Sequence, residues 1–140
     1  MKRLAVIPAR GGSTRLKNKN IYPLKGKPLI RWITEAVVSS ESFDKIIIST
    51  DSDAIFDAVK DLPVERHYRP SSHATTKATV LDAMISLMEE STQEYDTFSY
   101  FLPTCPFVSP EDIKKGAAML DTNVDSVISM TEIPETIQLS

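Results

Sequence analysis

Residues 4–20 read LAVIPARGGSTRLKNKN, a short apolar run followed by a loop rich in glycine and basic residues. The apolar run ends at Pro8, and its composition predicts a buried strand over Leu4–Ile7. The loop that follows carries two adjacent glycines, Gly11 and Gly12. This strand is the first of several that alternate with loops and helices along the chain.

Strands and helices are expected to alternate along the chain. The expected strands after the first cover residues 45–50, 64–68, 97–102 and 126–130. The expected helices run from Pro28 to about Ser39, from a cap at Asp51 or Ser52, from Thr76 or Thr79 through Met88, and from a cap at Ser109 to about residue 121.

This alternation predicts an α/β fold with a mainly parallel sheet and helices on both faces, similar to a Rossmann fold. Ligands of open parallel sheets bind at the carboxyl ends of the strands. We therefore expect the binding residues in the loops after the strands, which cover residues 8–20, 51–53, 69–79 and 103–109.

Positive charge is concentrated at the start of the chain. The first 34 residues hold nine of the sixteen Lys and Arg residues and no Asp or Glu, although the whole chain has a net charge of −3. A nucleic-acid-binding surface would show aromatic residues among the Lys and Arg residues, and the protein would have a basic pI. This chain has a pI of about 5.4. The cationic end therefore favours a small polyanion and not a nucleic acid.

Length and composition limit the class of protein. The 140 residues are 41% hydrophobic, which is enough for one domain with its own core. No apolar run approaches the roughly 20 residues that a membrane-spanning helix needs, and the apolar stretch before Pro8 is too short for a signal peptide. The single cysteine, Cys105, allows no internal disulfide. We expect one cytoplasmic domain over residues 1–140 with no membrane association.

The loop after the first strand has the groups that a nucleoside triphosphate needs. Glycine lets the backbone approach a phosphate closely, and hydroxyl and cationic side chains bind phosphate oxygens. The loop matches neither the GxxxxGK[ST] nor the GxGxxG pattern. The residues alone leave two interpretations open: a triphosphate-binding loop, and a solvated basic loop whose glycines serve only the turn.

Several segments resemble the sugar-acid cytidylyltransferases, above all the acylneuraminate (CMP-sialic acid) enzymes, and more distantly the octulosonate (KDO) enzymes. The matching segments are IPARGGSTRLKNKNIYPLKGKPLI at 7–30, IIISTDSDAI at 46–55, Arg69-Pro70, LPTCP at 102–106 and VDSVISM at 124–130. The resemblance implies a nucleotide-diphospho-sugar-transferase-like fold. It also implies transfer of CMP from CTP to a nine-carbon keto-acid sugar, with Mg²⁺ and release of pyrophosphate.

The resemblance assigns roles to particular residues. Arg10 and Lys19 would bind the triphosphate and stabilise charge at the α-phosphorus, which makes them the expected catalytic residues. The expected nucleotide-binding residues are Ala9, Arg10, Gly11, Gly12, Ser13, Arg15, Lys19, Asn20, Arg69, Thr79 and Thr104. Relatives continue into a dimerisation segment and an Asp-x-Asp pair that holds Mg²⁺. We therefore expect this chain to be the amino-terminal part of a homodimeric enzyme, without the family's metal ligands.

Departures from the family pattern bear on the sugar. Ser13-Thr14-Arg15 is closer to the octulosonate enzymes, whereas Lys19-Asn20 has the sialic-acid form. Leu102 stands where the family commonly has a sugar-facing Gln, and leucine cannot hydrogen-bond a sugar hydroxyl. The sequence therefore leaves sialic, legionaminic and pseudaminic types of sugar open.

Two other functions also stay open. One is a nucleotide-binding module without turnover, and the other is a nucleotide-sugar glycosyltransferase whose Asp-x-Asp would be Asp51 and Asp53. We interpret these two carboxylates as helix-capping and first-turn acids and not as metal ligands.

Overall fold

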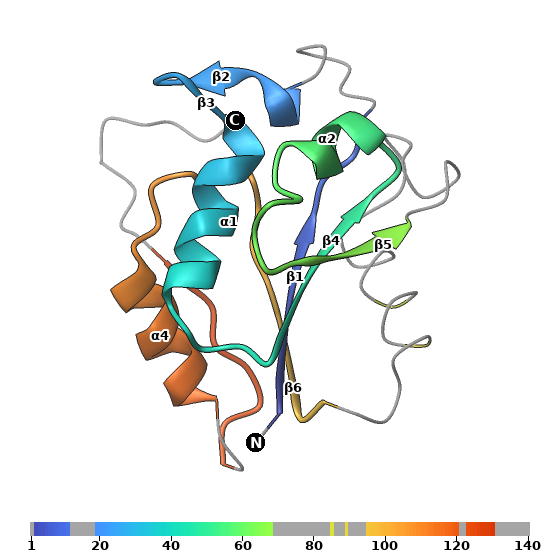
Figure 1. Ribbon diagram of the computed structural model, residues 1–140. Helices are drawn as coiled ribbons and strands as arrows, with labels where there is room; N and C mark the ends of the chain where they lie inside the picture. Colours follow the sequence, from blue (N-terminus) through green and yellow to red (C-terminus); the bar gives the residue numbers. More distant parts are fainter. Residues whose placement is uncertain are drawn as a thin grey trace, which may run out of the picture.

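A four-stranded parallel sheet lies at the centre of the computed structural model (Figure 1). The structure describes residues 2–11, 19–68, 85, 89, 95–120 and 123–130. The strands are β1 (Arg3–Pro8), β4 (Lys45–Thr50), β5 (Glu65–Tyr68) and β6 (Thr97–Tyr100), in the order β5-β4-β1-β6. These four strands confirm the predicted ones, although β6 ends two residues earlier than expected.

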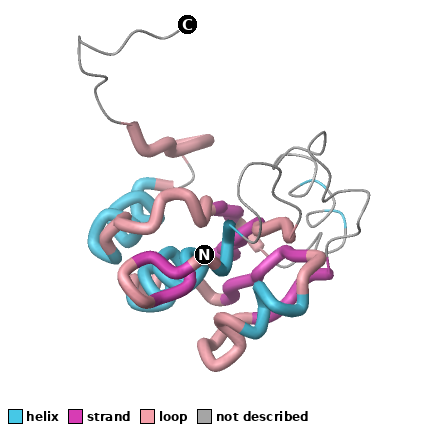
Figure 2. Tube along the Cα trace, turned by 90° about the horizontal axis from the view of Figure 1, so that it is seen from above, coloured by secondary structure: helices cyan, strands magenta, loops and turns pink. Residues whose placement is uncertain are grey.

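Three helices pack on one face of this sheet. They are α1 (Leu29–Ser39), α2 (Asp53–Asp57) and α4 (Pro110–Met119). Figure 2 shows the described helices beside the sheet from a second direction. The predicted caps are present: the Ile55 amide donates to Ser52 Oγ at 3.3 Å, and the Asp112 amide donates to Ser109 Oγ at 3.1 Å. The helix expected from Thr76 or Thr79 to Met88, which would cover the second face, falls largely outside the described residues.

Alternate residues of β1 point to opposite faces of the sheet, and both faces are buried. Ala5 and Ile7 face α1 and α4, and they are fully buried. Leu4 and Val6 face the other side with Ile47, next to Tyr95 and Phe98. Burial on both faces explains why β1 and β4 are continuous apolar runs without polar alternation.

A short hairpin precedes α1, and the sequence analysis did not predict it. The 3-10 helix η1 (Lys19–Ile21) leads into β2 (Pro23–Leu24) and β3 (Lys27–Pro28). Both turn residues have positive φ, 52° at Lys25 and 79° at Gly26, as a type I′ turn requires. Trp32 of α1 packs under this hairpin, where its Nε1 donates to the Leu24 carbonyl at 2.9 Å.

An ion-pair network joins α1 to the turn after α2. The Arg31 guanidinium binds both carboxylate oxygens of Asp61, at 2.7 and 2.8 Å, and also binds Glu35 and the Ala58 carbonyl. Lys27 contacts the second oxygen of Glu35. The hydrogen bonds from Arg31 lower the pKa of Asp61 to about 2, and the hydrogen bond from Lys27 is the largest cause that lowers the pKa of Glu35.

The strand predicted over residues 126–130 is absent, and this prediction was wrong. Residues 124–130 form no strand, and Ile128 and Met130 are 78% and 91% exposed. Figure 2 shows this segment as loop, outside the sheet. A β-favouring composition expresses how well side chains pack on a neighbouring strand, so it does not form a strand by itself. The last helix, α4, also ends slightly earlier than expected, at Met119.

The sheet order defines a topological switch point between β1 and β6. From β1 the chain proceeds through β4 to β5 on one side, and then β6 pairs with β1 on its other side. The strand order therefore reverses between β1 and β6, and ligands of open α/β sheets bind at the carboxyl ends of the strands at such a point. Among the described residues, no helix is both long and apolar enough to cross a membrane.

Candidate nucleotide-binding site

The segment after β1 is held against the neighbouring strand. Ala9 is 2% exposed, and its amide donates to the Ser49 carbonyl at 2.9 Å. The β1–β4 pairing thus extends one residue beyond the end of β1. Because this amide is used inside the chain, a nucleotide contact at Ala9 would have to come from another of its atoms.

The peptide group between Arg10 and Gly11 is held on both sides. Its carbonyl accepts a hydrogen bond from Asn20 Nδ2 at 2.9 Å, and its N–H donates to Asp51 Oδ1 at 2.9 Å. Asn20 lies in η1 and is 5% exposed, whereas Asp51 follows β4 directly. Three segments that are distant in the sequence therefore meet at this one peptide.

Gly11 packs too closely on the turn after β4 for a side chain to fit without adjustment. A Cβ atom at this position would lie 3.1 Å from Ser52 Cβ and 3.5 Å from Asp51 Oδ1. A separation of 3.1 Å is shorter than ordinary carbon–carbon contact. The glycine is therefore explained by packing inside the chain, in addition to any approach of a phosphate.

Arg10 and Lys19 bring positive charge to this edge of the sheet. Both are partly buried, and within the described residues neither side chain forms an ion pair. The two acids of the segment after β4 have other partners: Asp51 accepts from the Gly11 amide, and Asp53 pairs with Arg66 at 2.6 Å. The two cations are thus available to an anion.

The Asp51 and Asp53 carboxylates do not form a pair that fits Mg²⁺. One oxygen of Asp51 is taken by a backbone amide, and Asp53 is exposed and bound to a guanidinium. Ser52, between them, is the residue that caps α2. In the described part of the chain, no three His, Cys, Asp or Glu side chains gather as a metal site would require.

The loop after β6 lies at the same edge of the sheet. The Phe101 amide donates to the Val6 carbonyl, and the Cys105 amide closes a turn on the Leu102 carbonyl, both at 3.0 Å. Thr104 and Cys105 are exposed in this turn, and Leu102 is 37% exposed. The structure therefore places Thr104 on the loop at the carboxyl end of β6, beside the end of β1.

Five of the predicted nucleotide-binding residues lie outside the described residues: Gly12, Ser13, Arg15, Arg69 and Thr79. Of the others, Ala9, Arg10, Gly11, Lys19 and Asn20 come together around the end of β1. The part that Asp51 takes in this cluster was not predicted from the sequence. An acid directly after a buried strand, across the sheet edge from a glycine, was the available signal.

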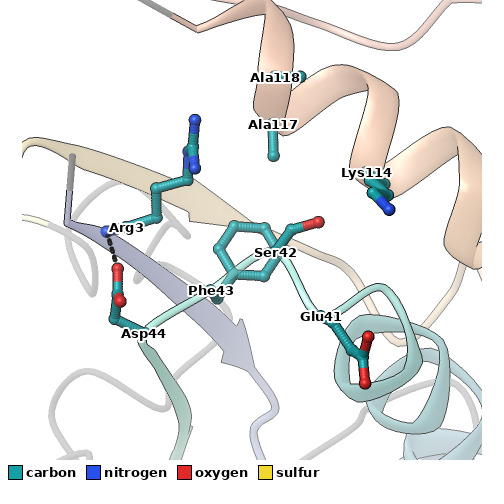
Figure 3. Close-up of a pocket in the computed structure, with 8 residues that line it drawn as sticks. All are labelled: Arg3, Glu41, Ser42, Phe43, Asp44, Lys114, Ala117 and Ala118. Carbon is teal, nitrogen blue, oxygen red and sulfur yellow. Dashed lines mark hydrogen bonds between the residues drawn. The ribbon is translucent and has the colours of Figure 1, made fainter.

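A separate cleft of about 300 Å³ opens at the opposite end of the sheet (Figure 3). Its walls come from the start of β1, the α1–β4 turn and α4. The lining residues are Arg3, Glu41, Ser42, Phe43, Asp44, Lys114, Ala117 and Ala118. The Arg3 amide donates to Asp44 Oδ2 at 2.7 Å at the edge of this cleft. Because it lies at the amino ends of the strands, this cleft contains none of the predicted site residues.

The sequence matches the cytidylyltransferase family model over residues 4–138, nearly the whole chain. The chain belongs to the cytidylyltransferase family. It is 32% identical over 140 residues to the N-acylneuraminate cytidylyltransferase of Escherichia coli, a match that covers 99% of this chain and 33% of the relative. It is 35% identical over 137 residues to the CMP-N,N'-diacetyllegionaminic acid synthase of Legionella pneumophila, covering 95% of this chain and 59% of the relative.

A solved structure shows the same fold as this chain. A CMP:2-keto-3-deoxy-manno-octonic acid synthetase, solved in complex with CTP, superimposes with a TM-score of 0.71 at 23% identity. The match covers 85% of this chain and 47% of that structure. The expected nucleotidyltransferase-like α/β fold is therefore confirmed. The chain spans between about a third and three-fifths of the length of the two relatives described above.

Proposed function

We propose that this cytidylyltransferase binds CTP at the carboxyl ends of β1 and β6 and transfers CMP to an acidic nine-carbon keto sugar. The anomeric hydroxyl oxygen of the sugar attacks the α-phosphorus of CTP and forms a new P–O bond. The bond between the α-phosphorus and the bridging oxygen breaks, and pyrophosphate leaves with that oxygen. The hydroxyl proton passes to solvent or to a base.

One observation carries this proposal: two cations without ion-pair partners in the described residues flank a backbone segment that is fixed at the switch point of the sheet. Arg10 and Lys19 would bind the phosphates and offset the negative charge that develops as pyrophosphate leaves. Because their backbone is already fixed by hydrogen bonds, little reorganisation is needed when CTP binds. Such a site acts through positioning and charge, without a covalent intermediate.

The sugar that we propose is an acyl sugar acid of the sialic, legionaminic or pseudaminic type. Relatives named for two of these substrates match the chain at similar identity. Leu102 is exposed on the loop after β6, and an apolar side chain there would contact the sugar without a hydrogen bond. This favours an acylated or deoxygenated part of the sugar at that position.

From the family to which the chain belongs, we also propose that the enzyme uses Mg²⁺ and forms a homodimer. The described carboxylates do not fit Mg²⁺, so we derive no step through the metal. When bound, Mg²⁺ would neutralise phosphate charge on the triphosphate. The residues of this chain would supply binding and orientation.

The test is to incubate the chain with CTP, Mg²⁺ and a panel of nine-carbon and eight-carbon keto-acid sugars, and to measure pyrophosphate. Release with one nine-carbon sugar supports the proposal, and release with octulosonate alone reassigns the substrate. Calorimetric binding of CTP without release with any sugar indicates a nucleotide-binding module. Transfer from a nucleotide sugar to an acceptor would overturn the proposal.

A further inference from the structure

We infer that Asp51 and Asn20 are positioning residues: they fix the Arg10–Gly11 peptide and thereby direct the Arg10 side chain toward the phosphates. This inference rests on the proposed function, because it takes CTP as the ligand of Arg10. It gives Asp51 a role in the binding site instead of the helix-capping role expected from the sequence, and it gives Asn20 an indirect role instead of a direct contact with nucleotide.

The geometry of the peptide carries the inference. Its carbonyl and its N–H each form a hydrogen bond of 2.9 Å, to side chains from two different segments. A peptide plane held through both groups cannot rotate without loss of at least one bond. The ψ angle of Arg10 is one of the two torsions that set this plane, so the clamp restricts the backbone from which the Arg10 side chain extends. The bond from the Ala9 amide to Ser49 fixes the preceding residue in the same way.

Asn20 holds the carbonyl group of the Arg10–Gly11 peptide. It is 5% exposed, and its side-chain amide donates to the Arg10 carbonyl across a separation of ten residues. Lys19, the neighbouring residue, begins η1. The 3-10 helix η1 therefore brings Lys19 close to the backbone of Arg10. We infer that the hydrogen bond from Asn20 sets the position of Lys19 relative to Arg10.

Asp51 places a negative charge next to a site that we propose binds phosphates, which calls for a physical explanation. A carboxylate close to bound phosphates would weaken their binding by charge repulsion. The hydrogen bond from the Gly11 amide supplies the reason, because a carboxylate is a stronger acceptor for a backbone N–H than a neutral group. The close packing of Gly11 on Ser52 Cβ keeps the donor at this distance.

A neutral substitution separates positioning from metal binding. Asp51→Asn keeps an oxygen that can accept from Gly11, although a weaker acceptor than the carboxylate, so it should lose clearly less CTP affinity than Asp51→Ala. Asp51→Ala removes the acceptor and should weaken CTP binding about tenfold, equal to 1.4 kcal/mol. If Asp51→Asn were as damaging as Asp51→Ala, the carboxylate charge itself would be required and the positioning role would be wrong.

The decisive experiment is a double-mutant cycle of CTP binding, measured by calorimetry without sugar. The cycle uses wild type, Arg10→Ala, Asp51→Ala and the double variant. If Asp51 acts through Arg10, the double variant binds CTP about as weakly as Arg10→Ala alone. Additive losses would overturn the inference. Thermal unfolding of each variant checks that the chain stays folded.

Asp53→Ala is the matched control, because Asp53 lies in the same turn but pairs with Arg66 at the surface. Its CTP affinity should equal that of wild type within about twofold. Asn20→Asp replaces the donor with an acceptor and should weaken CTP binding as much as Asp51→Ala. A wild-type chain that binds no CTP would overturn the proposed function, whereas CTP binding with an additive cycle would overturn the positioning role alone.

Discussion

In the function that we propose, single residues at the end of β1 determine what this edge of the sheet can bind. Arg10 and Lys19 have no ion-pair partner in the described residues, whereas Arg31 and Arg66 are paired with acids. A cation already held by a carboxylate would have to exchange that partner for phosphate. The cations without partners are therefore the ones that a triphosphate can use at little cost.

Arg10→Ala and Lys19→Ala should each weaken CTP binding by about 10- to 100-fold, because a hydrogen bond to a charged group contributes about 1.5–3 kcal/mol. Calorimetric titration measures the change. Lys60→Ala is a suitable control, since Lys60 is exposed and pairs with Asp57 away from the site. Unchanged affinity in both variants would show that the triphosphate binds elsewhere.

Gly11→Ala should destabilise the chain by about 1–3 kcal/mol, the usual cost of inserting a methyl group into a packed site. The cause is the contact of 3.1 Å with Ser52 Cβ. Urea unfolding measures the loss. Ser52→Gly in the same chain removes the opposing Cβ, so most of the loss should be recovered, since glycine at a helix cap costs only a few tenths of a kcal/mol relative to serine. Failure of this rescue would mean that the strain lies elsewhere.

At the level of elements, the ion-pair network around Arg31 holds the hairpin, α1 and the turn after α2 together. This network makes stability depend on pH in the acid range. The pKa of Asp61 is lowered to about 2, so its contribution is present at pH values above the ordinary Asp range near 4. The contribution is lost as the pH falls from about 4 toward 2, and the lowered pKa of Glu35 acts in the same direction.

Asp61→Asn should therefore flatten the fall of the urea midpoint between pH 5 and pH 2. The midpoint is measured at intervals of half a pH unit in wild type and variant. Asp125→Asn, which changes an exposed carboxylate after α4, should leave the slope as it is in wild type. Equal slopes in all three chains would show that the network does not contribute.

Sequence patterns predicted those helices and strands whose ends or composition are marked by neighbouring residues. The caps at Ser52 and Ser109 are confirmed because each serine oxygen meets an amide within its own first turn. The hairpin at Lys25–Gly26 was missed because its strands have only two residues each. The strand expected at 126–130 was wrong because a strand depends on a partner that local composition does not specify.

Paired substitutions test whether residues 126–130 contribute to the fold. Ile48→Val removes one methylene from a fully buried side chain and should cost about 0.5–1.5 kcal/mol. Ile128→Val makes the same change at a side chain that is 78% exposed and should stay within about 0.5 kcal/mol of wild type. Equal losses in urea unfolding would place Ile128 in a packed environment.

For the whole molecule, the parallel order of the sheet explains how residues far apart in sequence form one site. The loops expected to bind ligand were predictable from strand ends alone, because all carboxyl ends of a parallel sheet face the same edge. The contact of Asp51 and Asn20 with one peptide was not predictable. It depends on the exact register of β1 against β4, which no local pattern contains.

In the described sheet the two interior strands, β1 and β4, lead to Arg10 and to Asp51, whereas the loop with Thr104 follows the edge strand β6. Edge strands open first in native-state amide exchange, and interior strands open near the global unfolding limit. The backbone that we propose to face the phosphates should therefore exchange slowly even without ligand, with Gly11 N–H among the protected amides. The frame that carries Arg10 and Asp51 would therefore stay intact when the loop after β6 adjusts to a bound sugar.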